Sequence, residues 1–191
     1  MHDDVLLKLA RVIGLLGLAL LILSSLIGTL MAARTAQKVN WLKARAFRSH
    51  RLLSLVGAAL FVLHPVPLLL AHHTTSLRLL NVFVPFTAPK QGILIAWGTL
   101  AAYALIVVTI SSLYIKQLGR RQWRLLHYAT YAVLVLGMLH ALTISNEFLQ
   151  SEPFRITEPD KFLLVLAVPL VLAFPVWRMA AARQARIKRA V

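Results

Sequence analysis

Long apolar segments separated by short basic stretches limit what this 191-residue chain can become. A helix of about 20 apolar residues is long enough to cross the roughly 30 Å hydrocarbon core of a bilayer. Hydrophobic residues make up 59% of the sequence, more than a soluble domain of this length has reason to carry. We therefore predict an all-α, polytopic transmembrane helix bundle, a single membrane domain over residues 1–191, with about five spans at 12–32, 52–71, 93–115, 125–144 and 162–177.

Charged residues are distributed unevenly around these spans. Fifteen of the 21 lysines and arginines fall within residues 34–51, 116–124 and 178–189, whereas all six acids lie in the other connecting and terminal segments. Because positively charged loops tend to stay in the cytoplasm, the pattern predicts an outer N-terminus and a cytoplasmic C-terminus. We expect an integral protein of a bacterial plasma membrane. The net charge of +15 then reflects topology and contact with membrane lipid, and not nucleic-acid binding.

Two of the predicted spans each carry a pair of histidines at nearly the same spacing. His50 and His64 are fourteen residues apart at the second span, and His127 and His140 are thirteen apart at the fourth. At 1.5 Å per residue, each pair covers about 20 Å along a helix. The second and fourth spans run in the same direction, because one crossing separates them. His50 should therefore meet His127 near the cytoplasmic face, and His64 should meet His140 nearer the outer face.

A histidine inside the bilayer is costly and needs a partner. Two facing imidazoles at two depths would hold two stacked b-type haems between the second and fourth spans, each iron bound by one imidazole from either side. The alternative is that the four are buried polar residues satisfied by neighbouring helices. One geometric point disagrees with the haem hypothesis. At 100° per residue, a spacing of thirteen turns His140 about 140° away from His127. A local helix irregularity, with Gly137 in the interval, or different azimuths for the two haems would resolve it.

The rest of the sequence limits the kind of site and offers weaker candidate residues. The chain has no cysteine, which excludes disulfides, iron–sulfur clusters and covalent haem attachment. No acid lies inside a predicted span, so a non-haem metal site fits less well. Arg51 and Arg124 lie close to the inner histidines, where they could pair with haem propionates or simply enforce topology. His72 and His73 at the outer end of the second span could bind an outer metal or a propionate, or be ordinary interfacial residues.

The histidine segments resemble the ferric reductase-like transmembrane domain family, whose relatives include NADPH oxidases and bacterial MsrQ-type haem subunits. The resemblance covers roughly residues 50–146. It rests on HRLLSLVGAALFVLHP at 50–65, VPF at 84–86, and WGTLAAYALIVVTISSLYIKQLGRRQWRLLHYATYAVLVLGMLHAL at 97–142. The two histidine spacings match those of the two-haem NADPH oxidases. The resemblance implies that His50 and His127 ligate an inner haem iron, and His64 and His140 an outer one.

The sequence also departs from the NADPH oxidases, which have six spans and a fused nucleotide domain. It contains no GxGxxG fingerprint, so we expect no flavin or NAD on this chain. A stand-alone MsrQ-type subunit is the closer analogy. We predict an electron-transfer subunit of an oxidoreductase, part of a larger complex, which takes electrons from a separate flavoprotein or quinol. The outer acceptor could be ferric iron, oxygen or a periplasmic redox protein. The alternatives are a structural or anchoring haem subunit and a haem sensor or transporter.

Overall fold

The computed structural model describes residues 2–32, 40–71 and 75–144, together with a few positions between 165 and 180. Helices and short connections make up the three continuous segments, and no strand occurs within them. This arrangement agrees with the all-α class predicted from the sequence. The helices are α1 (His2–Ala32), α2 (Asn40–Leu63), α3 (Pro65–Leu70), α5 (Leu79–Phe83), α6 (Gly92–Leu113), α7 (Ile115–His127) and α8 (Ala129–Thr143).

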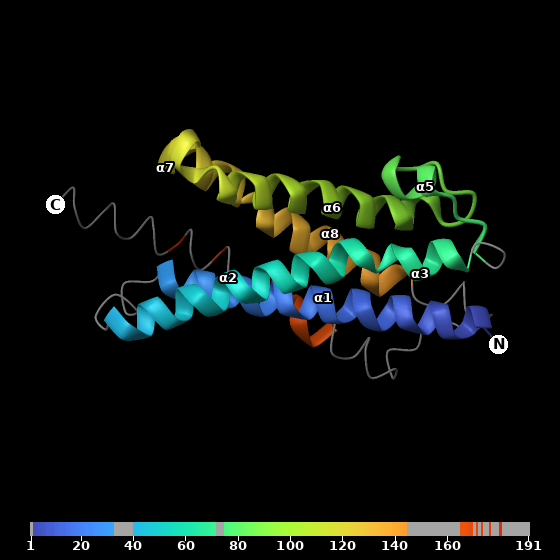
Figure 1. The fold of residues 1–191 in the computed structure, drawn as a ribbon, viewed down its shortest axis with the longest axis horizontal. Coiled ribbons are helices and arrows are strands. Elements are labelled where there is room, and N and C mark those ends of the chain that lie inside the picture. Colours follow the sequence, from blue (N-terminus) through green and yellow to red (C-terminus); the bar gives the residue numbers. More distant parts are fainter. Residues whose placement is uncertain are drawn as a thin grey trace.

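The helices form two long antiparallel hairpins that lie side by side (Figure 1). The first hairpin packs α1 along α2, and the second packs α6 along α8. Contacts between α1 and α8 join the two hairpins. Helices α2 and α8 start at the same end of the bundle and run in the same direction, as the sequence predicts (Figure 1). The two helices that carry histidines are therefore each supported by a neighbour from the same hairpin.

Helices α1 and α2 approach closely at a pair of facing glycines. A Cβ atom added to Gly57 would lie 3.1 Å from the carbonyl oxygen of Gly17, and one added to Gly17 would lie 2.9 Å from the backbone nitrogen of Phe61. Only glycine leaves room for backbones this close, which is how small residues act at helix contacts in membranes. Gly57 thus allows α1 and α2 to pack closely.

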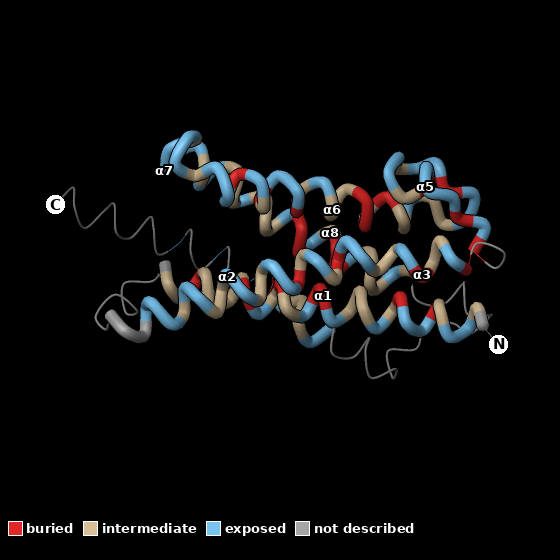
Figure 2. The backbone as a smooth tube through the Cα atoms, viewed as in Figure 1, coloured by how far each residue is buried: buried red, intermediate tan, exposed pale blue. Residues whose placement is uncertain are grey.

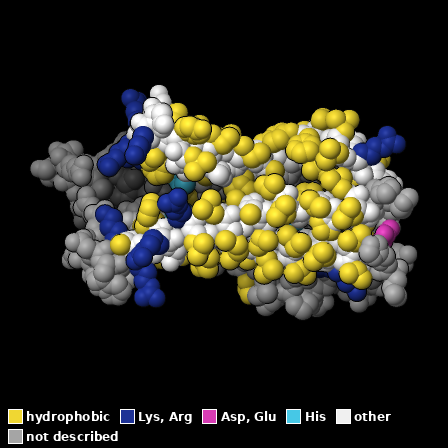
Figure 3. Space-filling view, in the orientation of Figure 1, with side chains coloured by type: hydrophobic (Ala, Val, Ile, Leu, Met, Phe, Trp, Pro, Cys, Tyr) yellow, Lys and Arg dark blue, Asp and Glu magenta, His cyan; other side chains and the backbone are white. Residues whose placement is uncertain are grey.

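Four helical segments are long and apolar enough to cross a membrane. They are Asp3–Met31, Lys43–Leu70, Gly92–Leu113 and Ile115–Thr143. They correspond to the first four predicted spans. The fifth prediction, residues 162–177, falls on a part of the chain of which the structure describes only scattered positions. Many leucine, valine and isoleucine side chains on the outward helix faces are more than half exposed. They form the apolar belt in Figure 3, so the protein is an integral membrane protein.

The core lies where the two hairpins face each other (Figure 2). Leu18 and Leu21 of α1, Phe61 of α2, and Val133 and Met138 of α8 are each at most 7% exposed. These side chains belong to one apolar cluster. Along the chain, Phe61 lies between His50 and His64, and Val133 and Met138 lie between His127 and His140. The cluster therefore lies between the two histidine pairs.

Candidate haem-binding site

The structure brings the four histidines together in two pairs, one at each level of the bundle. The ring centroids of His50 and His127 are 6.4 Å apart with an interplanar angle of 70°. Those of His64 and His140 are 6.1 Å apart with an angle of 63°. These are the two pairings that the parallel direction of the second and fourth spans predicts.

The separation of the rings suits a metal held between them. With a metal–nitrogen distance of about 2.0–2.1 Å and a ring nitrogen roughly 1.1 Å from its centroid, two imidazoles on opposite sides of one ion have centroids about 6.3 Å apart. Both observed distances lie close to this value. Two axial ligands can differ freely in their rotation about the common axis, so angles of 63° and 70° are acceptable.

Each pair supplies two nitrogen ligands. Among the described residues, no group of three or more histidine, cysteine, aspartate or glutamate side chains could hold a metal ion. A haem iron needs only two protein ligands, because the macrocycle supplies four nitrogens. The donor set of each pair therefore fits a haem iron.

At three of the four histidines a backbone carbonyl determines which ring nitrogen carries the proton. Nδ1 of His50 lies 2.8 Å from the carbonyl oxygen of Ser24. Nδ1 of His64 lies 2.6 Å from that of Phe61, and Nδ1 of His140 lies 2.7 Å from that of Leu94. Because a carbonyl oxygen only accepts, each Nδ1 must be the donor. Nε2 is then unprotonated and able to bind a metal. Histidine ligands typically show this pattern of a second hydrogen bond.

The proline after His64 explains why one of these carbonyls is available. In a helix the carbonyl of Phe61 would accept the backbone N–H of the residue four positions later. That residue is Pro65, which has no N–H and begins α3. The freed carbonyl of Phe61 accepts the Nδ1–H of His64 instead. The proline that follows His64 in the sequence therefore orients the His64 imidazole.

Two glycines make the other carbonyls accessible. A Cβ atom on Gly28 would lie 3.0 Å from the His50 ring, and one on Gly98 would lie 3.0 Å from the His140 ring. Each glycine follows the accepting carbonyl by four residues: Gly28 follows Ser24, and Gly98 follows Leu94. Helices α1 and α6, which carry none of the four histidines, thus use the same arrangement to hold one imidazole each.

Sequence reasoning missed this supporting layer. Gly14 also packs against a ligand ring, with its Cβ position 3.4 Å from His64. Gly14 and Gly28 are fourteen residues apart, the spacing of His64 and His50 on the antiparallel α2. A search for small residues at the histidine spacing on a neighbouring span would have found them.

The thirteen-residue interval contains a helix irregularity, one of the two solutions to the angular problem. Helix α7 ends at His127 and α8 begins at Ala129, with Tyr128 between them. The backbone N–H of Tyr131 donates to the carbonyl of Tyr128, three residues earlier, at 3.0 Å. This tighter turn adds about 20° per residue over the α-helix and reduces the offset between His127 and His140. The break falls at Tyr128, whereas Gly137 lies within α8.

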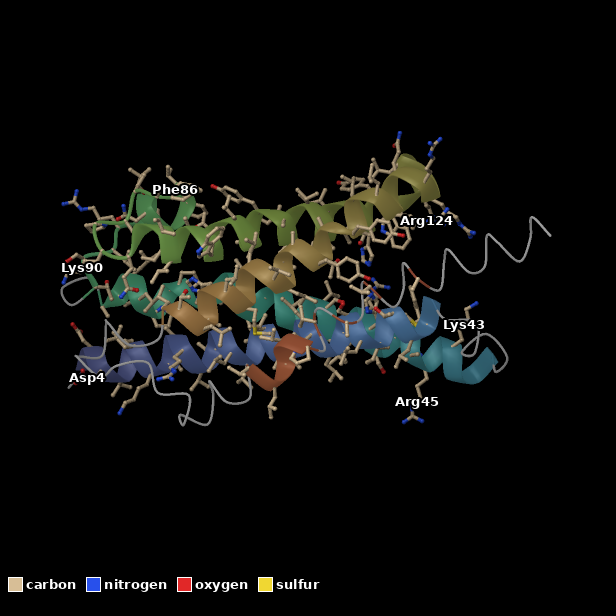
Figure 4. All side chains as sticks on the ribbon, turned by 180° about the vertical axis from the view of Figure 1, so that it is seen from behind. Asp4, Lys43, Arg45, Phe86, Lys90 and Arg124 are labelled. Carbon is tan, nitrogen blue, oxygen red and sulfur yellow. The ribbon has the colours of Figure 1, made fainter. Side chains whose placement is uncertain are left out.

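The inner pair lies near the basic end of the bundle. Lys43, Arg45 and Arg124 point outward at this end, while Asp4 and Lys90 lie at the opposite end (Figure 4). A histidine side chain shows among the basic ones there (Figure 3). The ring of Trp123 stacks on His127 at 4.9 Å and 27°. An open hollow of about 570 Å³ lies at the same end, lined by Arg121, Gln122, Arg124, Leu125 and Tyr128.

The outer pair borders a mainly apolar cavity of about 330 Å³. His64, His140 and Gly98 contribute to its lining, and so does Arg11 of α1. Arg51 and Arg124, predicted as propionate partners, are both exposed. Arg124 donates from Nε to the carbonyl of Arg120 at 3.3 Å. His72 and His73 lie outside the described residues.

A helical membrane bundle with two facing pairs of imidazoles defines a class of membrane redox proteins. The chain belongs to the family described as ferric reductase like transmembrane component, whose model matches residues 13–138. The match includes α1 from residue 13 onward and three of the four paired histidines; His140 lies two residues beyond it. Domains of this family generally bind haem and carry electrons. No match was found among curated proteins or solved structures.

Replacing Gly98 with alanine tests the support of the outer imidazole. The new Cβ would lie 3.0 Å from two ring atoms of His140 and would push the ring away from its carbonyl partner. We expect Gly98→Ala to lose most of the haem bound at the outer pair and to keep the inner one, as measured by the reduced haem spectrum per chain.

Gly137→Ala is the matched control. Its Cβ would meet only side-chain atoms of Leu18 and Phe61, at 3.3–3.9 Å. Both substitutions remove a helical glycine, which favours the helix by roughly 0.5–1 kcal/mol. Equal haem content in the two variants would contradict the proposed role of Gly98.

Proposed function

We propose that this protein is a di-haem b-type cytochrome that carries electrons across the membrane, from a cytoplasmic donor to an outer acceptor. The proposal rests on the two pairs of imidazoles, since each pair has the ring separation expected of two ligands to one metal ion. The family supports a membrane redox role, and the geometry supports two sites within it.

A haem bound at each pair would supply an iron that changes reversibly between the ferric and ferrous states. His50 with His127 would hold one haem, and His64 with His140 would hold the other. Two imidazoles leave no open position at the metal, which suits electron transfer better than oxygen activation. The two histidine levels are about 21 Å apart along α2. The two sites together would therefore span most of a hydrocarbon core of roughly 30 Å.

The chain's own side chains exclude water between the two levels. Phe61 is 4% exposed and lies with its ring 5.6 Å from His64. Leu134 and Met138 from α8 are equally buried, at 3% and 4%. A dry, apolar interval keeps the sites in a low-dielectric environment, where nearby charges and hydrogen bonds influence their potentials most strongly.

The distribution of charge supports the orientation. Eight described lysines and arginines lie around the start of α2 and along α7, where the inner pair sits: Lys43, Arg45, Arg48, Arg51, Lys116, Arg120, Arg121 and Arg124. Under the positive-inside rule this end faces the cytoplasm. His50 and His127 would then receive electrons, and His64 and His140 would deliver them outside.

The basic end is also suited to docking a donor. Arg121 and Arg124 line the open hollow on α7, the helix that also carries the stacked rings of Trp123 and His127. An acidic flavoprotein would complement these charges. Quinol is the other candidate donor, and the outer acceptor would dock at the end that carries His64 and His140. The protein would thus work with separate partners in a redox complex.

Electron transfer across a sealed membrane tests the proposal directly. Vesicles containing the protein and entrapped ferricyanide would be mixed with external dithionite, which does not cross lipid. We expect the wild type to reduce the entrapped ferricyanide. His64→Ala should abolish this transfer while the inner haem still becomes reduced, because the second site of the pathway is lost.

His2→Ala, which lies outside both pairs, is the control and should behave as the wild type. A structural or anchoring subunit would give no faster ferricyanide reduction than protein-free vesicles. That result would reject the electron-transfer proposal even if haem is bound.

Neutralising part of the basic surface tests the docking of the donor. Arg120→Gln with Arg121→Gln should slow haem reduction by an acidic flavin reductase about tenfold at low salt, because steering depends on complementary charge. High salt should slow the wild type in the same way. The matched pair Arg78→Gln with Lys90→Gln changes two exposed charges at the other end and should have no effect. A rate insensitive to salt and to both pairs would exclude this docking surface.

A further inference from the structure

Ser24 of α1 lies at the centre of a hydrogen-bond network around the inner imidazole. Its side chain is buried, with 2% of the residue exposed. Its hydroxyl oxygen is 2.8 Å from Nδ1 of His50 and 2.6 Å from the hydroxyl oxygen of Ser54. Its own carbonyl oxygen is 2.8 Å from the same Nδ1. One residue of a helix without ligands therefore contacts His50 through both backbone and side chain.

The protons of this network can be assigned from the partners. Nδ1 of His50 donates to the carbonyl of Ser24, because that oxygen only accepts. The Ser54 hydroxyl donates to the carbonyl of His50 at 2.7 Å. The Ser24 hydroxyl then donates to Ser54 at 2.6 Å or to the carbonyl of His50 at 3.1 Å. Its lone pairs remain available as a second acceptor for the Nδ1–H.

Within the described part of the chain, neither histidine of the outer pair has a hydroxyl bonded to its Nδ1. The Nδ1–H of His64 donates to the carbonyl of Phe61 in its own helix, and that of His140 donates to the carbonyl of Leu94. His50 thus has two acceptors for its Nδ1–H, where His64 and His140 each have one carbonyl. Acceptors at this position increase the basicity of a ligating imidazole and stabilise the more highly charged metal.

We propose that Ser24 is a positioning residue that holds His50 with Nε2 facing His127 and lowers the reduction potential of the inner haem. This inference rests on the proposed di-haem function. Its consequence is directional, since a lower inner potential favours electron movement from the inner site to the outer site. Helix α1 would contribute the thermodynamic bias of the pathway although it carries no ligand.

Potentiometric titration of Ser24→Ala tests the proposal, with the two haems assigned by titrating His64→Ala, which keeps only the inner one. We expect the inner potential to rise by about 59 mV, a tenfold change in the one-electron equilibrium, while the outer potential stays constant. The ferric electron paramagnetic resonance spectrum of the inner haem should change as well. Ser24→Thr, which keeps a hydroxyl, should restore both properties.

Ser111→Ala is the matched control, because Ser111 of α6 is equally buried at 1% and its hydroxyl bonds within its own helix to the carbonyl of Val108. An inner potential unchanged in Ser24→Ala, or shifted equally in Ser111→Ala, would overturn the proposal while leaving the di-haem function intact. Loss of the inner haem in Ser24→Ala with recovery in Ser24→Thr would support positioning; loss in both would show a packing role and overturn it. A wild type without haem would reject the proposed function itself.

Discussion

An imidazole within the hydrocarbon region is costly unless its ring nitrogens have partners. The rest of this structure follows from that requirement. Backbone carbonyls of Ser24, Phe61 and Leu94 satisfy Nδ1 of three histidines. The opposite nitrogen of each ring is left for a metal. Carbonyls in a helix are normally shielded by the following turn, so the local backbone must make them accessible.

Glycine and proline provide this access in two ways. Gly28 and Gly98 remove the side chain that would block a ring from the neighbouring helix, and Pro65 removes the N–H that would compete for the carbonyl. The antiparallel hairpins explain why the supports come from α1 and α6. Each histidine helix lies along a partner whose residues meet it in reverse order. The family match begins within α1, which agrees with a supporting role for that helix.

The sequence predicted the helical class, four of the spans, the parallel direction of the two histidine helices and the pairing of His50 with His127 and His64 with His140. These features depend on hydrophobic length and on helical rise, which are regular along a chain. The position of the break at Tyr128 was not predicted, because the tight turn there depends on local hydrogen bonds. Ser24, Gly28 and Gly98 were also missed, since their roles depend on helix contacts between distant residues. The fifth span stays a prediction from the sequence.

The haem-to-protein ratio of the purified protein, with its reduced-minus-oxidised spectrum, tests the central claim most directly. The account predicts two b-type haems per chain in the wild type. It predicts one in His64→Ala and one in His127→Ala, each variant losing a different haem. A wild type that binds no haem, or variants that bind as much as the wild type, would contradict the assignment of these imidazole pairs as haem ligands.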